Sequence, residues 1–134
     1  MALLPANAPE ATGAVDVRIV GARSAKGMIR ACLTSNPRFF PNCDKDNTSF
    51  KASVHAAPDA VIRFANVPPG DYAVTVLHDE NENFKLDTTL GIPREGVGFS
   101  RNPRLVMSAP SFTATVFKVA GASVPLTVTL KYFL

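Results

Sequence analysis

The stretch that decides the fold is residues 60–78, which read AVIRFANVPPGDYAVTVLH. Apolar and polar residues alternate at both ends of this stretch, which is typical of β-strands that bury one face. The Pro-Pro-Gly sequence in the middle favours a tight turn, because proline presets φ and glycine accepts positive φ. We therefore predict strands at 60–66 and 72–78, joined by a turn at 67–71.

The same period of two recurs outward in both directions, and no segment keeps a helical period over three turns. We expect the first two strands of the chain to pair as a hairpin. A long loop at 35–49 carries a short helical turn around Phe39 and Phe40, and the Gly-, Asn- and Pro-rich segment 96–110 is expected to be coil. The further strands are predicted at 14–20, 27–34, 50–55, 111–119 and 123–133.

This spacing of short strands predicts an all-β fold, a single-domain antiparallel β-sandwich of about seven strands, either immunoglobulin-like or prealbumin-like. The chain has 134 residues, of which 46% are hydrophobic, enough for the core of one domain. We assign 14–134 to the sandwich and 1–13 to a flexible N-terminal segment. That segment is small, polar and proline-containing, as at the start of a mature exported protein, although a cytoplasmic start is equally compatible.

Charge is distributed unevenly along the chain. The net charge is only +3, and the basic residues are scattered without interleaved aromatics, which argues against nucleic-acid binding. No apolar run approaches the roughly 18 residues of a transmembrane segment. Five of the eleven acidic residues fall within 79–95, and this window is a candidate cation site or a solvated turn.

Cys32 and Cys43 lack the spacing of redox or zinc motifs. Cys32 falls in a predicted strand and Cys43 in the loop that follows it. Two interpretations remain open. A disulfide could hold the loop to the sheet in an oxidising compartment, or Cys32 is buried and Cys43 is an exposed free thiol.

The acidic window resembles a calcium-binding loop in its spacing. Calcium takes six to eight hard oxygens, and alternate residues of a curled loop can converge on one ion. Two residues depart from the pattern, Phe84 at the glycine position and Leu90 at the bidentate glutamate position. The loop is therefore either a weak calcium site or a turn in which Asn and Asp cap their own backbone. The candidate ligands are Asp79, Asn81, Asn83, Asp87 and the Lys85 carbonyl.

His78 lies at the end of the predicted strand 72–78, beside Asp79. It is a candidate metal ligand or general base, and the alternative is a structural histidine hydrogen-bonded to loop backbone. A hydrolase could pair His78 with Asp79, Glu80 or Glu95. The chain shows no serine or cysteine nucleophile motif and no glycine-rich phosphate loop, so this is the least favoured function.

Three segments resemble a known family: FANVPPGDYAVTVLHDENENFKLDT (64–88), GIPREGVGFSRN (91–102) and VGARSAKGMIR (20–30). They are similar to the bacterial domain-of-unknown-function 2141 family of small exported proteins. The family's loop typically reads Asp-Glu-Asn-Gly-Asn-Gly-Lys-Leu-Asp, and here Glu82 and Phe84 replace both glycines. The Pro-Pro-Gly-Asp-Tyr turn also resembles transthyretin-like and carboxypeptidase-regulatory-like sandwiches, which are mostly accessory or binding modules.

The resemblance implies a periplasmic or secreted protein. We expect a non-enzymatic module that binds a protein or small-molecule partner, with calcium as the candidate cofactor in the 79–87 loop. The alternative function is a small-molecule or metal-binding protein that uses the 78–95 loop as its site.

Overall fold

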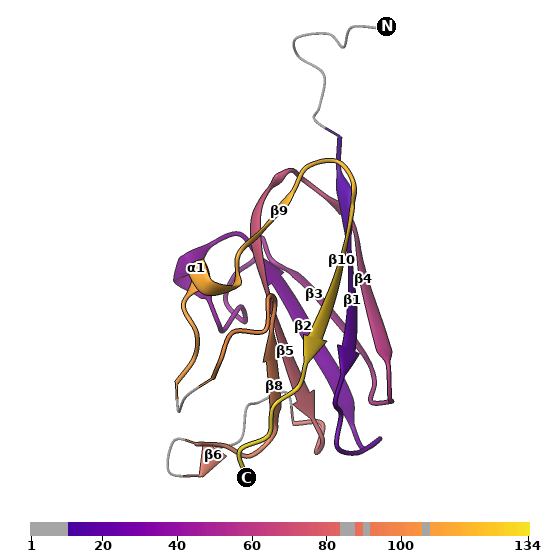
Figure 1. Ribbon diagram of the computed structural model, residues 1–134, viewed down its shortest axis with the longest axis vertical. Coiled ribbons are helices and arrows are strands. Elements are labelled where there is room, and N and C mark those ends of the chain that lie inside the picture. The colour runs from indigo at the N-terminus through magenta and orange to yellow at the C-terminus, as the bar shows by residue number, and fades with distance from the viewer. Residues whose placement is uncertain (1–10, 84–87, 90–91, 106–107) are drawn as a thin grey trace, which may run out of the picture.

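The computed structural model describes residues 11–83, 88–89, 92–105 and 108–134, and over these residues the chain forms two packed β-sheets (Figure 1). The predicted β-sandwich is therefore confirmed. One sheet has the strand order β10-β1-β4, with β10 at Ser123–Thr129, β1 at Gly13–Val20 and β4 at Ala60–Val67. The other has the order β3-β2-β5-β8, with β3 at Phe50–His55, β2 at Met28–Thr34, β5 at Gly70–Asp79 and β8 at Gly96–Phe99. A small hairpin pairs β6 (Thr88–Thr89) with β7 (Ile92–Pro93).

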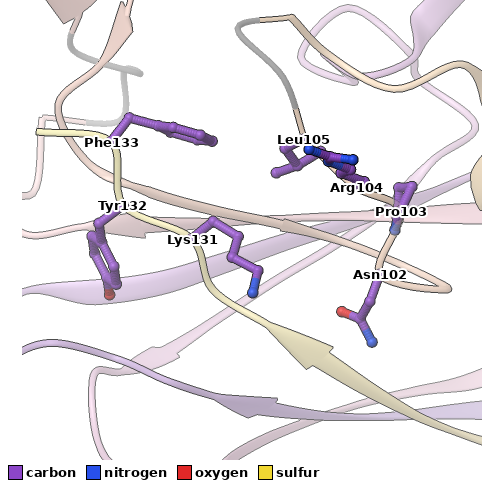
Figure 2. A pocket seen from close by; sticks show the side chains of 7 residues that line it. All are labelled: Asn102, Pro103, Arg104, Leu105, Lys131, Tyr132 and Phe133. Carbon is purple, nitrogen blue, oxygen red and sulfur yellow. The ribbon is translucent and has the colours of Figure 1, made fainter.

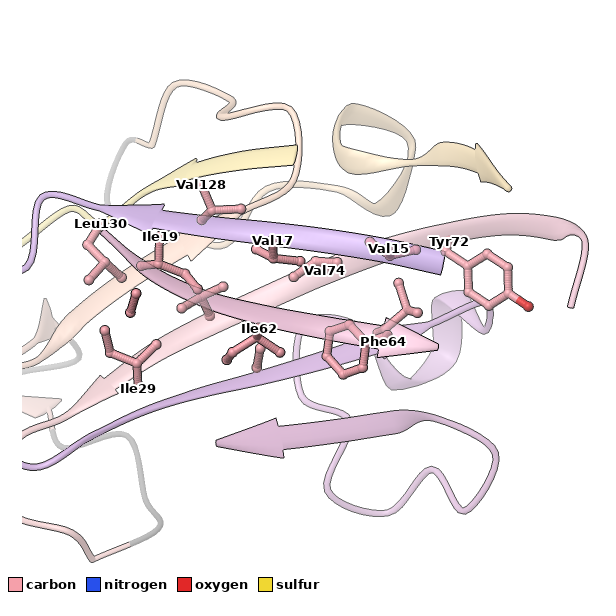
Figure 3. Close-up of a cluster of buried hydrophobic side chains, with 14 of the residues drawn as sticks. Val15, Val17, Ile19, Ile29, Ile62, Phe64, Tyr72, Val74, Val128 and Leu130 are labelled. Carbon is pink, nitrogen blue, oxygen red and sulfur yellow. The ribbon is translucent and has the colours of Figure 1, made fainter. Parts of the chain in front are cut away.

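The core lies between the two sheets, where the alternating apolar residues of each strand meet (Figure 3). On β5 the predicted face is buried, with Val74 and Val76 fully enclosed and Tyr72 at 6% exposure. The turn before β5 is fixed by this same tyrosine, whose hydroxyl donates to the Pro68 carbonyl at 2.8 Å. The turn and its strand are therefore locked together by one side chain.

The prediction of a hairpin between the first two strands was wrong. β1 pairs with β10 in parallel and with β4 antiparallel, whereas β2 pairs with β3 and β5 in the other sheet. The connection between β1 and β2 crosses from one layer to the other. Period-two patterning identifies a strand but not its neighbour, because each strand of a sandwich presents the same alternation.

Residues 96–110 were expected to be coil, but they begin with β8, which pairs with β5. Its glycines lowered the strand signal, and the structure shows why they are there. A Cβ at Gly96 would collide with the Tyr132 ring, and one at Gly98 would collide with Val128. Glycine in this strand therefore marks a close approach of the chain's last segment.

The predicted strand at 111–119 is divided into two elements. The short helix α1 spans Phe112–Thr115, and the Ser111 hydroxyl caps it by accepting from the Ala114 N–H. Only β9 (Phe117–Val119) is extended, and it pairs with the start of β5. β8 and β9 thus share one edge of β5. Between them the buried Ser100 hydroxyl accepts from the Val74 N–H and donates to the Thr115 carbonyl.

The loop between β2 and β3 is tied back to the second sheet. It holds the disulfide Cys32–Cys43, which confirms the first of the two interpretations of these cysteines. A short 3₁₀ helix (η1, Pro37–Phe39) forms where a helical turn was predicted. The next residue, Phe40, packs edge-to-face against Phe99 and Phe112. Within the described part of the chain, no helix has the length and apolar character needed to cross a membrane.

Candidate functional site

His78 ends the buried face of β5, and its side chain is fully enclosed. Its Nε2 lies 2.8 Å from the Lys26 carbonyl, and its Nδ1 lies 2.7 Å from the Tyr132 hydroxyl. A carbonyl can only accept, so Nε2 carries the proton and Nδ1 accepts from Tyr132. The Tyr132 oxygen accepts in turn from the Arg23 N–H at 3.1 Å. Both ring nitrogens are thus committed to the scaffold, and neither faces solvent where a substrate could reach it.

Glu80 is held by two neighbours on the loop between β1 and β2. Arg23 donates to it from Nε and Nη2, at 2.9 and 2.6 Å, and the Ser24 hydroxyl donates at 2.8 Å. The Arg23 hydrogen bonds are the main reason that the pKa of Glu80 lies below its usual value. Arg23 also donates to the Leu134 carbonyl and stacks on the Tyr132 ring, so this cluster fastens the last residues of the chain.

Glu95 is buried beside this cluster, at 4% exposure. The pKa of Arg23 is raised chiefly by its hydrogen bonds to Glu80, and the charge of Glu95 raises it further. His78, Glu80 and Glu95, all candidate site residues from the sequence, therefore lie at one end of the sandwich. What the structure adds is that the Arg23 guanidinium and the Tyr132 hydroxyl occupy the centre of the group.

The Asp79 carboxylate is fully buried and is held by Arg30 and by the backbone of Asn83. Its Oδ2 accepts from Arg30 Nε at 2.8 Å, and its Oδ1 accepts from the Asn83 N–H at 3.1 Å. Asn81 Oδ1 accepts from the same N–H at 3.3 Å. The first half of the predicted calcium loop is thus folded as an Asx-type turn with a guanidinium against its first carboxylate.

The loop curls here without glycine. Glu82 replaces a glycine of the family pattern, and it adopts the left-handed φ of +55° that a glycine would take. The other two candidate ligands, the Lys85 carbonyl and Asp87, lie outside the described residues. Among the residues that are described, no cluster of three or more His, Cys, Asp or Glu side chains could hold a metal ion.

A groove that the sequence did not indicate lies next to this cluster (Figure 2). One wall is 102–105, which follows β8, and the other is 131–133, which follows β10. Its volume is about 360 Å³, within the usual range for small-molecule sites. The lining combines the apolar Pro103, Leu105 and Phe133 with the cations Arg104 and Lys131. Figure 2 shows the Phe133 ring extending from the C-terminal wall toward Leu105 and Arg104.

Both walls of the groove are fastened to the sandwich. Asn102 donates to the Thr127 carbonyl and accepts from the Thr129 N–H, at 2.8 and 2.9 Å, so it pairs with the edge of β10 as a strand residue would. Lys131 exchanges two backbone hydrogen bonds with Val97. The groove is therefore built on the strands. Sequence reasoning missed it because its two walls are far apart in the chain and neither carries a motif.

The turn that leads into the first wall is strained. Arg101 and Asn102 are consecutive left-handed residues, with φ of +65° and +45°. Asparagine tolerates this region, but arginine pays about 1 kcal/mol or more for it. Such backbone strain tends to persist where the surrounding structure fixes it and where a site uses the resulting direction of the chain.

Comparison with known proteins gives one family. The sequence model described as an uncharacterized protein conserved in bacteria, domain of unknown function 2141, matches residues 17–127. No curated protein and no solved structure matches the chain.

Proposed function

The chain belongs to the domain-of-unknown-function 2141 family of bacterial proteins, and we propose that it is an exported, non-enzymatic binding module that takes its ligand in the groove at 102–105 and 131–133. The observation that carries this proposal is a contrast between neighbours. His78, Asp79 and Glu80 are all engaged by groups of the scaffold. Arg104 and Lys131 line an open groove and have no ion-pair or side-chain hydrogen-bond partner among the described residues.

The proposal includes the compartment and the finer likeness of the fold. The Cys32–Cys43 disulfide supports export, because disulfides persist outside the reducing cytoplasm. The Tyr72 hydroxyl bonded to Pro68 supports the likeness to transthyretin-like and carboxypeptidase-regulatory-like sandwiches, since it uses the same Pro-Pro-Gly-Asp-Tyr turn. Modules of that kind mostly bind or assist other molecules rather than transform them.

An NMR screen tests binding and turnover together. The ¹⁵N-labelled protein is mixed with a library of small anionic, neutral and cationic compounds, and the amide spectrum reports contact while the compound's own ¹H spectrum reports any reaction. We expect amide shifts at 102–105 and 131–133 with every bound compound recovered unchanged. Conversion of a compound, abolished by His78→Gln, would instead establish a hydrolase. If amide shifts occur only outside 102–105 and 131–133, or do not occur at all, the proposal that the groove binds the ligand is wrong.

A second candidate is weak calcium binding by the 79–87 loop. Its support is that the Asp79 and Asn81 side-chain oxygens lie close together in a loop already curled at Glu82, and calcium would have to displace the Asn83 N–H from them and compete with Arg30 for Asp79. With a Kd on the order of 1 mM, 10 mM calcium would raise Tm by about 5 °C relative to chelator. Asn81→Ala, an exposed position, should reduce that rise. An equal Tm with calcium and with chelator would exclude this site.

A further inference from the structure

We infer that the groove selects a small organic anion, namely a flat apolar body that bears one carboxylate; this inference rests on the proposed function and adds the ligand class to it. The charge at the groove is entirely of one sign. Its lining residues include Arg104 and Lys131 and no acidic residue. Both side chains are exposed, and they come from opposite walls, so an anion in the groove has one cation on each wall to bind.

The chain leaves the charge of the two groove cations unneutralised. Arg18, Arg23, Arg30 and Arg63 each form an ion pair within the chain, and the other described cations, the two in the groove among them, form none. The two groove cations have no such partner among the described residues, although the acidic Glu80 and Glu95 lie at the same end of the sandwich. Glu80 already forms an ion pair with Arg23, and the Glu95 side chain is buried. The chain therefore supplies no described carboxylate to the groove, and a ligand can.

The apolar lining sets the rest of the ligand. Phe133 is half-buried and offers a ring, while Pro103 and Leu105 on the other wall are also half-buried and offer aliphatic surface. A flat apolar body between these walls gains both ring contact and desolvation. A volume of about 360 Å³ admits a molecule of one or two rings and is too small for a folded partner. An inorganic anion alone would leave the apolar walls uncovered.

Preformed walls favour a small ligand, because binding then needs no reordering of the chain. Asn102 and Lys131 are held by hydrogen bonds to β10 and β8, and Tyr132, which follows Lys131, is held by His78. The long side chains of Arg104 and Lys131 are exposed, so a ligand has to order them on binding. Their ordering on the ligand limits the expected affinity to the micromolar or millimolar range.

Four probes test the ligand class by NMR titration: benzoate, two compounds of similar size (the neutral benzamide and the cationic benzylamine), and the smaller inorganic phosphate. We expect benzoate to shift amides at 102–105 and 131–133 and to bind about tenfold more tightly than benzamide, with no binding of benzylamine. Phosphate should bind more weakly than benzoate because it does not contact Phe133.

Three variants identify the groups responsible. Arg104→Gln and Lys131→Gln change exposed side chains, so the fold should be retained. Each variant should bind benzoate about fivefold more weakly and should bind benzamide with unchanged affinity. Phe133→Ala should weaken the binding of both benzoate and benzamide. The matched control is Lys118→Gln in β9, which makes the same charge change at the opposite end of the sandwich and should have no effect (Figure 1).

The outcomes separate this inference from the proposed function. If benzoate and benzamide bind the groove equally, or if Lys118→Gln weakens benzoate as much as Arg104→Gln does, the groove is a binding site but does not select an anion. If phosphate binds as tightly as benzoate, the inference that the ligand has an apolar body is wrong. If no compound of any charge shifts the groove amides, both the inference and the proposed function fail.

Discussion

Replacing Tyr132 with phenylalanine tests how the end of the sandwich is held together. The change keeps the ring, its packing on Gly96 and its stacking with Arg23, and removes only the hydroxyl. The Arg23 N–H lies near solvent and can bond to water instead. His78 Nδ1 cannot, because the imidazole is fully buried, so a ring nitrogen is left without its donor. An orphaned buried acceptor and a lost hydrogen bond together cost about 2–3 kcal/mol.

The magnitude converts directly into a melting temperature. Unfolding entropy of about 2.1 cal/mol/K per residue over 134 residues gives roughly 4 °C per kcal/mol. Tyr132→Phe should therefore lower Tm by about 7–11 °C, measured by circular dichroism. The protein contains its own control, because its only other tyrosine, Tyr72, makes one bond to the Pro68 carbonyl. Tyr72→Phe should cost about 1 kcal/mol, or about 4 °C.

A double-mutant cycle isolates the bond itself. In a His78→Leu background the imidazole is already gone, so Tyr132→Phe should cost less than half of what it costs in the native chain. The reasoning is refuted if Tyr132→Phe lowers Tm no more than Tyr72→Phe does, or if its cost is the same in both backgrounds. Either result would mean that His78 is not held by the tyrosine.

Three other predictions concern the scaffold. The double variant Cys32→Ser and Cys43→Ser removes the disulfide between residues that are 11 apart in sequence, which should cost about 3 kcal/mol of stability and lower Tm by about 10 °C. An unchanged Tm would show that the loop is held by packing alone. Hydrogen bonds from Arg23 hold the pKa of Glu80 below its usual 4.5, so the stabilisation by Glu80 is complete above about pH 4.5 and is lost as the pH falls through the lower folded-state pKa. Glu80→Gln should therefore flatten the fall of Tm across that acidic range, and a curve parallel to the native one would contradict this. Arg101→Gly relieves a left-handed φ of +65° and should preserve or raise stability by up to about 1 kcal/mol in urea unfolding, whereas Arg101→Val should lower it.

The sequence predicted the strands well where the side chains on one face pack into the core. Residues 60–78 show this, because the alternation of β4 and β5 follows directly from the core between the sheets. β8 was not predicted as a strand, because its glycines, Gly96 and Gly98, are required by contacts with Tyr132 and Val128, which lie more than 25 residues away in the chain. The pairing of β1 with β10 was not predicted for a related reason, since the pairing of strands in a sandwich depends on contacts between residues that are distant in sequence.

The candidate site shows the same limit. The cluster of His78, Asp79, Glu80 and Glu95 could be recognised from composition, because titratable groups gather there in sequence. Whether such groups are available depends on Arg23, Arg30 and Tyr132, which come from other strands and loops. The groove depends on a juxtaposition of 102–105 with 131–133 that no local pattern records.

The shared edge of β5 has an evolutionary consequence. β8 and β9 both close this edge, and the chain between them leaves at Ser100 and returns at Thr115, where one hydroxyl bridges the two points. Because departure and return are adjacent in space, the excursion can change in length or composition without disturbing the pairing on either side. One wall of the groove lies on that excursion. Relatives could thus acquire different ligand preferences by replacing this segment alone, while inheriting the same core.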